Sequence, residues 1–207
     1  MTKFRKSLKL GTCVAGLSLF SVLLIGPAAL GQEPPQADQP SQGPAPGNSG
    51  AMGDAKFAKK AARGGMAEVK MGQLAQEKGG SDVVKQFGQR MIDDHTKAGE
   101  QLKAAAMKEN ITLPNDVSPK DKATYDALWK LSGAEFDRAY ARDMVKDHTE
   151  DVSDFNSEAT SGQSPAIKQF ATETLPTLQD HLKQAKDMRR SVSAGNDSKR
   201  NAESNNQ

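Results

Sequence analysis

The sequence predicts an all-α fold, and three observations support it. Apolar residues recur every three or four positions through four long segments, which is the spacing of a helix with one buried face. Residues that commonly begin helices stand at the start of these segments: Asp54, Ser81, Ser132 and Ser164. No segment alternates apolar and polar residues for long enough to predict a strand. We therefore expect a domain built from helices alone.

The caps and turns divide the domain into four long helices and one short one. We expect the long helices over residues 54–78, 82–110, 132–160 and 164–190, and the short one over 118–131. Ser118, Pro119 and Asp121 predict a capping box for the short helix, and Ser132 with Glu135 predicts another for the third long helix. The connections at 79–81 and 161–164 are short, so two antiparallel hairpins are expected.

The connection between the hairpins is long and contains the short helix. It can return along the length of a long helix, which gives an up-down-down-up order, as in ferritin-like four-helix bundles with one crossover. An up-down-up-down order is the alternative. A short repeat suggests that one hairpin is a duplicate of the other: Ser81, Val84, Lys85, Gln86 and Phe87 recur 83 residues later as Ser164, Ile167, Lys168, Gln169 and Phe170.

The first 31 residues have the pattern of a signal peptide. Basic residues without acids are followed by an apolar stretch from 10 to 26, and Ala29 and Gly31 fit a peptidase cut before Gln32. An uncleaved membrane anchor is the alternative, because the apolar stretch is near the lower length limit for crossing a bilayer. Cleavage predicts a periplasmic or secreted protein with no stable membrane insertion. It also removes Cys13, the only cysteine.

The segments that flank the domain are polar. Residues 32–54 contain five prolines and are expected to form a disordered tether, and residues 191–207, rich in Asn and Ser, a disordered tail. Residues 55–190 are enough for one domain with an apolar core. Cleavage would leave 24 basic residues against 26 acidic ones, a net charge of −2. This balance argues against a nucleic-acid partner.

All three histidines lie on predicted inward faces. His95, His148 and His181 fall on the apolar stripes of the second, third and fourth long helices, and Glu68 falls on that of the first. Counted from the tight turns, the four residues lie at similar heights near the middle of the helices. Such side chains at one level predict a transition-metal site, with zinc, copper, manganese and iron all compatible with the ligands.

An aspartate precedes each histidine: Asp94, Asp147 and Asp180. Adjacent residues on a helix do not face each other, so these carboxylates are expected to support a histidine of a neighbouring helix or to complete the coordination. The alternative to a metal site is a buried hydrogen-bond network that holds the helices in register without a metal. A ferritin-type di-iron centre is disfavoured, because Ile92 and Leu178 occupy the positions where it requires Glu.

The sequence shows no arrangement typical of a catalytic nucleophile or a phosphate-binding loop. No catalytic residue is therefore assigned, and an enzyme is not the favoured interpretation. Gly64 and Gly65, in the first long helix, are expected to allow close contact between helices.

The pattern as a whole resembles the bacterial domain-of-unknown-function family 4142. The residues that carry the similarity are Phe57, Glu68, Leu74, Ala75, Met91, Asp94, His95, Phe136, Tyr140, Met144, His148, Leu175, Pro176, Leu178 and His181. The resemblance implies a ferritin-like bundle in exported proteins, often labelled outer-membrane proteins, without an activity, substrate or metal. Two hypotheses follow: a metal-binding bundle in stress or metal handling, and a structural or interaction module with a protein partner in the cell envelope.

Overall fold

The computed structural model describes residues 47–204, with side chains for residues 53–194. The described part contains five helices: α1 (Gly47–Lys78), α2 (Asp82–Lys108), α3 (Pro119–Trp129), α4 (Gly133–Ser161) and α5 (Pro165–Ser204). Its only β-type pairing is an isolated bridge between Gly79 and Gly133. The all-α prediction is confirmed. None of the helices in this part is long and apolar enough to cross a membrane. The predicted signal peptide lies outside the described residues.

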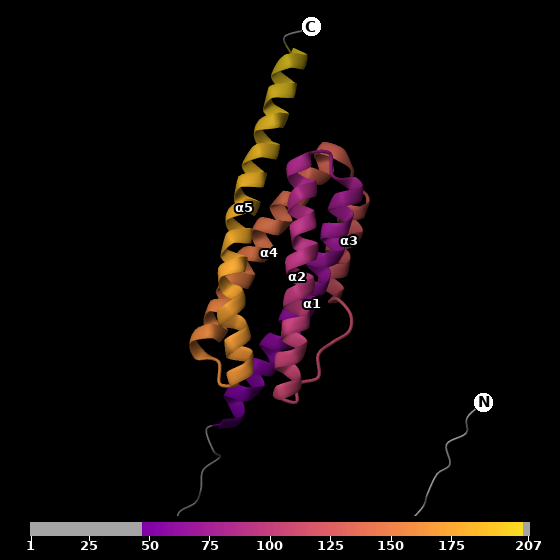
Figure 1. Cartoon of the computed structure of the whole chain (residues 1–207). Helices are drawn as coiled ribbons and strands as arrows, with labels where there is room; N and C mark the ends of the chain where they lie inside the picture. The colour runs from indigo at the N-terminus through magenta and orange to yellow at the C-terminus, as the bar shows by residue number, and fades with distance from the viewer. Residues whose placement is uncertain (1–46, 205–207) are drawn as a thin grey trace, which may run out of the picture. The chain divides into compact units, whose positions relative to one another are not determined.

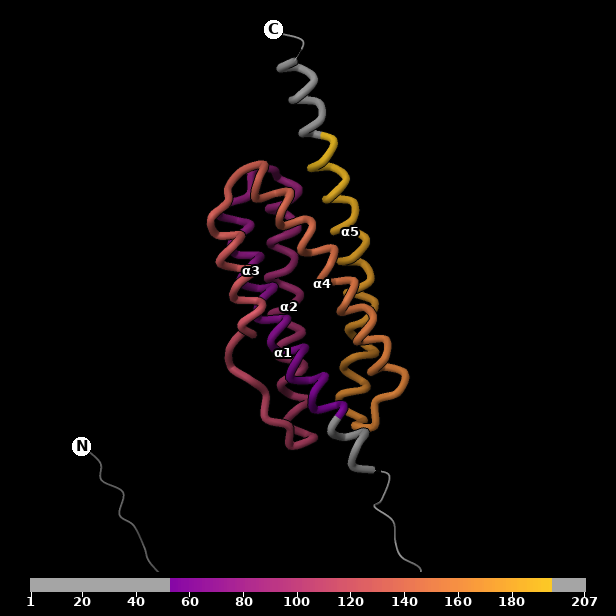
Figure 2. The backbone as a smooth tube through the Cα atoms, turned by 180° about the vertical axis from the view of Figure 1, so that it is seen from behind, coloured from indigo at the N-terminus to yellow at the C-terminus, as the bar shows by residue number. Residues whose placement is uncertain are grey.

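The two hairpins are joined at both ends (Figure 1). The end of α1 meets the start of α4, where Gly79 pairs with Gly133. The end of α2 meets the start of α5, where the Ala166 N–H donates to Glu109 Oε1 at 2.9 Å. The four long helices therefore run up, down, down and up. Figure 2 shows α3 in the connection that returns from the end of α2 to the start of α4.

Asp54 caps a different helix from the one predicted. Helix α1 begins earlier, at Gly47, so Asp54 lies within it. Its buried carboxylate accepts hydrogen bonds from the N–H groups of Gln163, at 2.8 Å, and Ser164, just before α5. The start of a helix leaves N–H groups without partners, and here a side chain distant in sequence satisfies them. In the same way, Asp137 of α4 accepts from Gly80 N–H at 2.8 Å in the α1–α2 turn.

The other helix ends agree only in part with the prediction. Ser118 and Asp121 form the predicted capping box. Ser132 occupies the N-cap position of α4, but its side chain makes no capping hydrogen bond, so that prediction was wrong. The chain turns there through Gly133, whose φ is +54°, and packs against Gly79 instead. Helix α5 continues to Ser204, past the predicted end, because no proline follows Pro176 to stop it.

The structure extends the repeat to one contact at each turn. Under the offset of 83 residues, the bond from Gly80 to Asp137 corresponds to the bond from Gln163 to Asp54. Asp137 of the second hairpin therefore binds the turn of the first, and the equivalent residue Asp54 of the first hairpin binds the turn of the second. Such reciprocal contacts are those of an approximate two-fold relation between the hairpins.

Two apolar clusters fill the interior on either side of a polar centre. The first, which includes Phe87, Phe136 and Tyr140, packs beside the α1–α2 turn, and the rings of Phe136 and Tyr140 stack with centroids 5.5 Å apart. The second, which includes Phe155 and Phe170, packs beside the α4–α5 turn. The four predicted site residues belong to neither cluster, although all are buried.

The close approach of α1 to α2 occurs at Gly72 and not at the glycines expected from the sequence. A Cβ atom at Gly72 would lie 2.5 Å from the carbonyl oxygen of Gly88. At Gly64 a Cβ atom would meet nothing within 4 Å, and at Gly65 it would lie 3.9 Å from His95 Nδ1. The prediction was therefore wrong for Gly64, which faces open space, and Gly65 lies only at ordinary contact distance from the His95 ring, so neither position requires a glycine for close approach.

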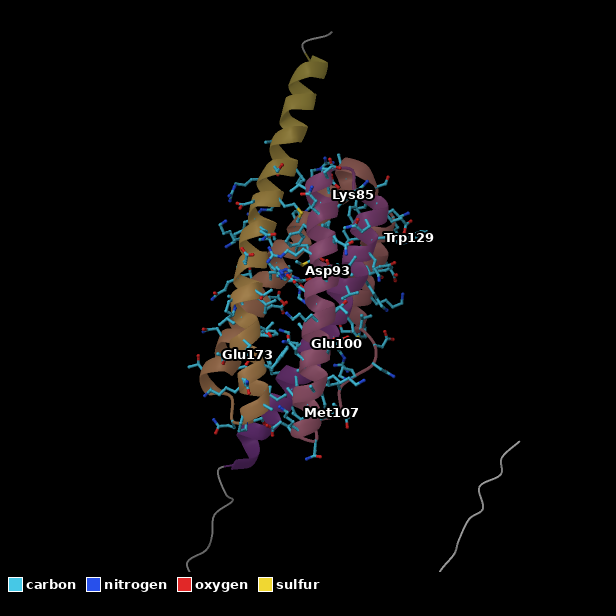
Figure 3. All side chains as sticks on the ribbon, in the orientation of Figure 1. Lys85, Asp93, Glu100, Met107, Trp129 and Glu173 are labelled. Atoms are coloured by element: carbon cyan, nitrogen blue, oxygen red, sulfur yellow. The ribbon has the colours of Figure 1, made fainter. Side chains whose placement is uncertain are left out.

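Helix α3 packs on the long helices through the buried Leu128 and the partly buried Tyr125, both against the first apolar cluster. Trp129 is 54% exposed, and the Lys78 ammonium lies 4.9 Å from its ring centroid. Figure 3 shows Trp129 on the outer side of α3, and Lys85 and Met107 near opposite ends of α2.

Candidate metal centre

Each long helix contributes one side chain to the buried polar centre. Glu68 comes from α1, His95 from α2, His148 from α4 and His181 from α5, and none is more than 7% exposed. The ring centroids of the three histidines lie 5.3–5.8 Å apart. One ligand atom from each ring lies within 4.8 Å of those of the other two. The structure thus brings the predicted residues together at one level.

Two of the imidazoles have tautomers that their partners determine. His148 Nδ1 lies 3.0 Å from the carbonyl oxygen of Met144, which can only accept, so Nδ1 donates and Nε2 keeps its lone pair. His181 Nε2 lies 2.7 Å from Asp94 Oδ2, so Nε2 donates and Nδ1 keeps its lone pair. Arg90 Nε in turn donates to Asp94 Oδ2 at 3.1 Å.

Glu68 connects the remaining histidine to this pair. Its Oε2 lies 3.1 Å from His95 Nδ1, and its Oε1 lies 3.4 Å from His148 Nε2, too far for a good hydrogen bond. Within the described residues, one buried atom of each site residue has no hydrogen-bond partner: Glu68 Oε1, His95 Nε2, His148 Nε2 and His181 Nδ1. Buried polar atoms rarely stay unpartnered, so this set requires a physical explanation.

Burial determines the charges at the centre. It lowers the pKa of His95 to about 3 and that of His148 to about 4, and it lowers the pKa of His181 against the opposing effect of Asp94. Burial also raises the pKa of Glu68 well above its ordinary value, and the nearby carboxylates of Asp151 and Asp147 raise it further. At neutral pH the imidazoles are therefore neutral, which is the form that binds metals.

The three predicted supporting aspartates have different surroundings. Asp94 contacts a histidine of another helix, as expected for a residue that orients a ligand. Asp180 instead pairs with Arg90, whose guanidinium nitrogen lies 2.8 Å away. Burial raises the pKa of Asp147, and Lys120 opposes this rise. Among residues 53–194, Asp94 is the one aspartate of the three that contacts an imidazole.

Two features around the centre were not predicted from the sequence. Arg90 binds both Asp94 and Asp180, and its position four residues before Asp94 on one helix is a spacing that predicts an ion pair. Asp143 and Asp151 continue the line of Asp147 along α4 at four-residue spacing. Burial raises the pKa of Asp143 to about 7.

A pocket leads from the surface to Glu68. It has a volume of about 640 Å³ and lies between α1, the start of α3, and α4. Its acidic wall residues include Asp121, Asp147 and Asp151, and Glu68 is its most buried charged residue. Five basic side chains also line the pocket, so its charges balance: Lys56, Lys59, Lys60, Arg63 and Lys120.

Comparison with known proteins places the chain in a family without indicating an activity. The chain is similar to two crystal structures, of a secreted DUF305 protein from Streptomyces coelicolor (14% identity, TM-score 0.58) and of a DUF305 fragment from Deinococcus radiodurans (13% identity, TM-score 0.58). The similarity covers 68% and 69% of this chain, and 92% and 96% of those chains. At this identity it shows the fold alone. No curated protein matches the chain. The model of the family described as domain of unknown function (DUF4142) matches residues 39–188, so the chain belongs to that family, as its resemblance implied.

Proposed function

We propose that this chain is an exported protein whose four long helices form a ferritin-like four-helix bundle and bind a transition-metal ion, in stress or metal handling. The observation that carries the proposal is the convergence of three buried, neutral imidazoles, each with an unpartnered nitrogen. Four unpartnered buried atoms cost stability unless something binds them. A cation satisfies all four at once.

The residues have separate roles in this proposal. His95, His148 and His181 are ligands, and Glu68 supplies a fourth through Oε1, giving up its proton when the cation binds. The ligand nitrogens, within 4.8 Å of one another, would approach to about 3.4 Å around a tetrahedral ion at ordinary bond lengths. Asp94 and the Met144 carbonyl orient two of the rings. Zinc, copper, manganese and iron all accept imidazole and carboxylate ligands.

Export is part of the proposal and rests on two supports. Residues 1–31 have the composition of a signal peptide, and the similar protein from Streptomyces coelicolor is named as secreted. We therefore place the cleaved protein in the periplasm or outside the cell, without stable membrane insertion and without a nucleic-acid partner. The segments predicted to be disordered, residues 32–54 and 191–207, overlap the start of α1 at Gly47 and the end of α5 at Ser204, so a tether before the bundle would comprise residues 32–46.

A second candidate function is a structural or interaction module of the envelope that holds no metal. Its support is the position of Glu68 between His95 and His148. With a proton on Glu68, which its raised pKa favours, the carboxyl and the His95 ring form a neutral hydrogen-bonded pair that holds α1 and α2 in register.

Elemental analysis of the protein, purified without chelators or a histidine tag, tests the proposal. The wild type should contain close to one metal ion per chain. A variant with His95→Ala, His148→Ala and His181→Ala should contain none. Met91→Leu is the matched control: Met91 is fully buried one turn before His95, and leucine has a similar volume, so the metal should be retained. Wild-type protein that is free of metal and resists reconstitution would refute the metal site and favour the structural module.

A further inference from the structure

A second pocket adjoins the first and shares Gly64, Glu68 and Asp151 with it. It is a cavity of about 820 Å³ with a wall formed mainly by α1 and α2, and residues 111–116 of the connection after α2 and three residues of α5 also contribute. The wall is mostly apolar, while Glu68, His95 and the half-buried Asp151 supply polar groups at its inner part and exposed polar side chains such as Lys70 and Lys103 also line it. Glu100 and the exposed Met107 lie at its rim (Figure 3). Its volume is in the range of small-molecule sites.

The offset of 83 residues that relates the two hairpins also relates this cavity to the histidine centre. With the offset of 83 residues, three wall residues correspond to the three histidines, and a fourth corresponds to the shared glutamate. The pairs are Gly65 with His148, Ala98 with His181, Leu178 with His95, and Asp151 with Glu68. The two hairpins thus build one polar site and one apolar cavity from equivalent positions.

Smaller side chains explain the volume of the cavity. Ala61 stands where the histidine side has Met144, and Thr174 stands where it has Met91. The helices do not close the resulting space, since a Cβ atom at Gly64 or Gly99 would meet nothing within 4 Å. Proteins normally pack their interiors densely, and unfilled apolar space lowers stability. A bound molecule accounts for a space that is kept open.

We propose that this cavity binds a small molecule with an apolar aliphatic or aromatic body and a hydrogen-bond donor at one end. The apolar body lies against Leu102, Phe170 and Leu178, and the donor meets a carboxyl oxygen of Asp151 or Glu68. A peptide segment is a poorer occupant, because its backbone groups would face a wall with few polar partners. The proposal does not depend on the metal.

Fluorescence titration with 1-aminoanthracene, an aromatic amine, tests the proposal on the purified, chelator-treated protein. We expect saturable binding of one molecule per chain. Gly64→Leu and Gly99→Leu extend a side chain from two wall positions with open space, and each should weaken binding at least about tenfold. Gly53→Leu is the matched control, because Gly53 also lies in α1 with nothing near its Cβ position but does not line the cavity.

The controls separate loss of the cavity from loss of the fold. Thermal melts should show that all three variants remain folded, and Gly53→Leu should bind the probe as the wild type does. Two independent wall variants guard against misfolding of either one. Absence of saturable binding to the wild type would overturn the proposal. So would equal affinity of the wild type and both folded wall variants.

Discussion

Substitution of Gly72 by alanine tests the closest helix contact of the structure. The added Cβ atom would lie 2.5 Å from Gly88 O, 3.0 Å from Ile92 Cγ1 and 3.3 Å from Met91 Cβ. The nearest of these is a backbone oxygen of α2, which cannot move as a side chain can. The two helix backbones would have to separate by about 1 Å to restore an ordinary contact near 3.5 Å.

The expected loss of stability follows from two opposing terms. Overpacking of a dense interior costs about 1–3 kcal/mol. Alanine in place of glycine within a helix contributes about 1 kcal/mol in the other direction. The net change for Gly72→Ala is a destabilisation of up to about 2 kcal/mol. Gly64→Ala on the same helix has only the favourable term, because its Cβ meets nothing within 4 Å, and should stabilise by about 0.5–1 kcal/mol.

Urea denaturation of both variants measures the difference. The free energy of unfolding of Gly64→Ala should exceed that of Gly72→Ala by about 0.5–3 kcal/mol, which at the upper end corresponds to several degrees in Tm. Gly88→Ala should behave like Gly72→Ala, since its Cβ would lie 2.7 Å from Ala75 Cβ. If Gly72→Ala and Gly64→Ala are equally stable, α1 and α2 do not approach at Gly72 as described, and the packing argument fails.

Three further predictions concern the carboxylates of Asp54, Asp143 and Asp94. Asp54→Ala removes the acceptor of two hydrogen bonds at the α4–α5 turn and should lower the free energy of unfolding by about 2–3 kcal/mol in urea; an unchanged midpoint would contradict this role. Burial raises the pKa of Asp143 to about 7, above the unfolded value of about 4. Between these two pH values the folded state holds a proton that the unfolded state releases. The free energy of unfolding therefore falls as the pH rises from about 4 to about 7. Asp143→Asn should therefore gain about 1 kcal/mol over the wild type at pH 8 and nothing at pH 4, and parallel pH profiles in urea titrations would rule this out. Asp94→Ala should weaken metal binding about 10–100-fold in a competition titration, because Asp94 contacts the His181 ring. Asp180→Ala should not weaken it, because Asp180 is next to His181 in sequence but pairs with Arg90. Equal effects of the two substitutions would show that contact with the His181 ring does not matter for metal binding.

The helices and their buried faces could be predicted because both depend on local sequence. Ser118 and Asp121 are three residues apart, so their capping box is visible in the sequence and is present in the structure. The inward positions of His95, His148 and His181 follow from helical spacing, and all three are buried. The signal peptide and the disordered flanks remain predictions.

Predictions failed where a partner distant in sequence was involved. Asp54 looked like the cap of its own helix, but the N–H groups it satisfies belong to a turn more than one hundred residues away. Gly64 and Gly72 are both glycines of α1, and only the position of α2 distinguishes the contact from the open space. Of the three aspartates beside histidines, only the arrangement of the helices selects Asp94.

The sequence alone determined that the chain is helical, where its helices turn, and that one glutamate and three histidines lie inside at one level. Periodicity and caps act over a few residues, so they can be read without knowing the neighbours. The tertiary structure decided the up-down-down-up order and which nitrogen of each imidazole has no hydrogen-bond partner. It also decided that a cavity lies at the positions equivalent to the histidines. These depend on distances between helices, and a linear pattern contains no such distances.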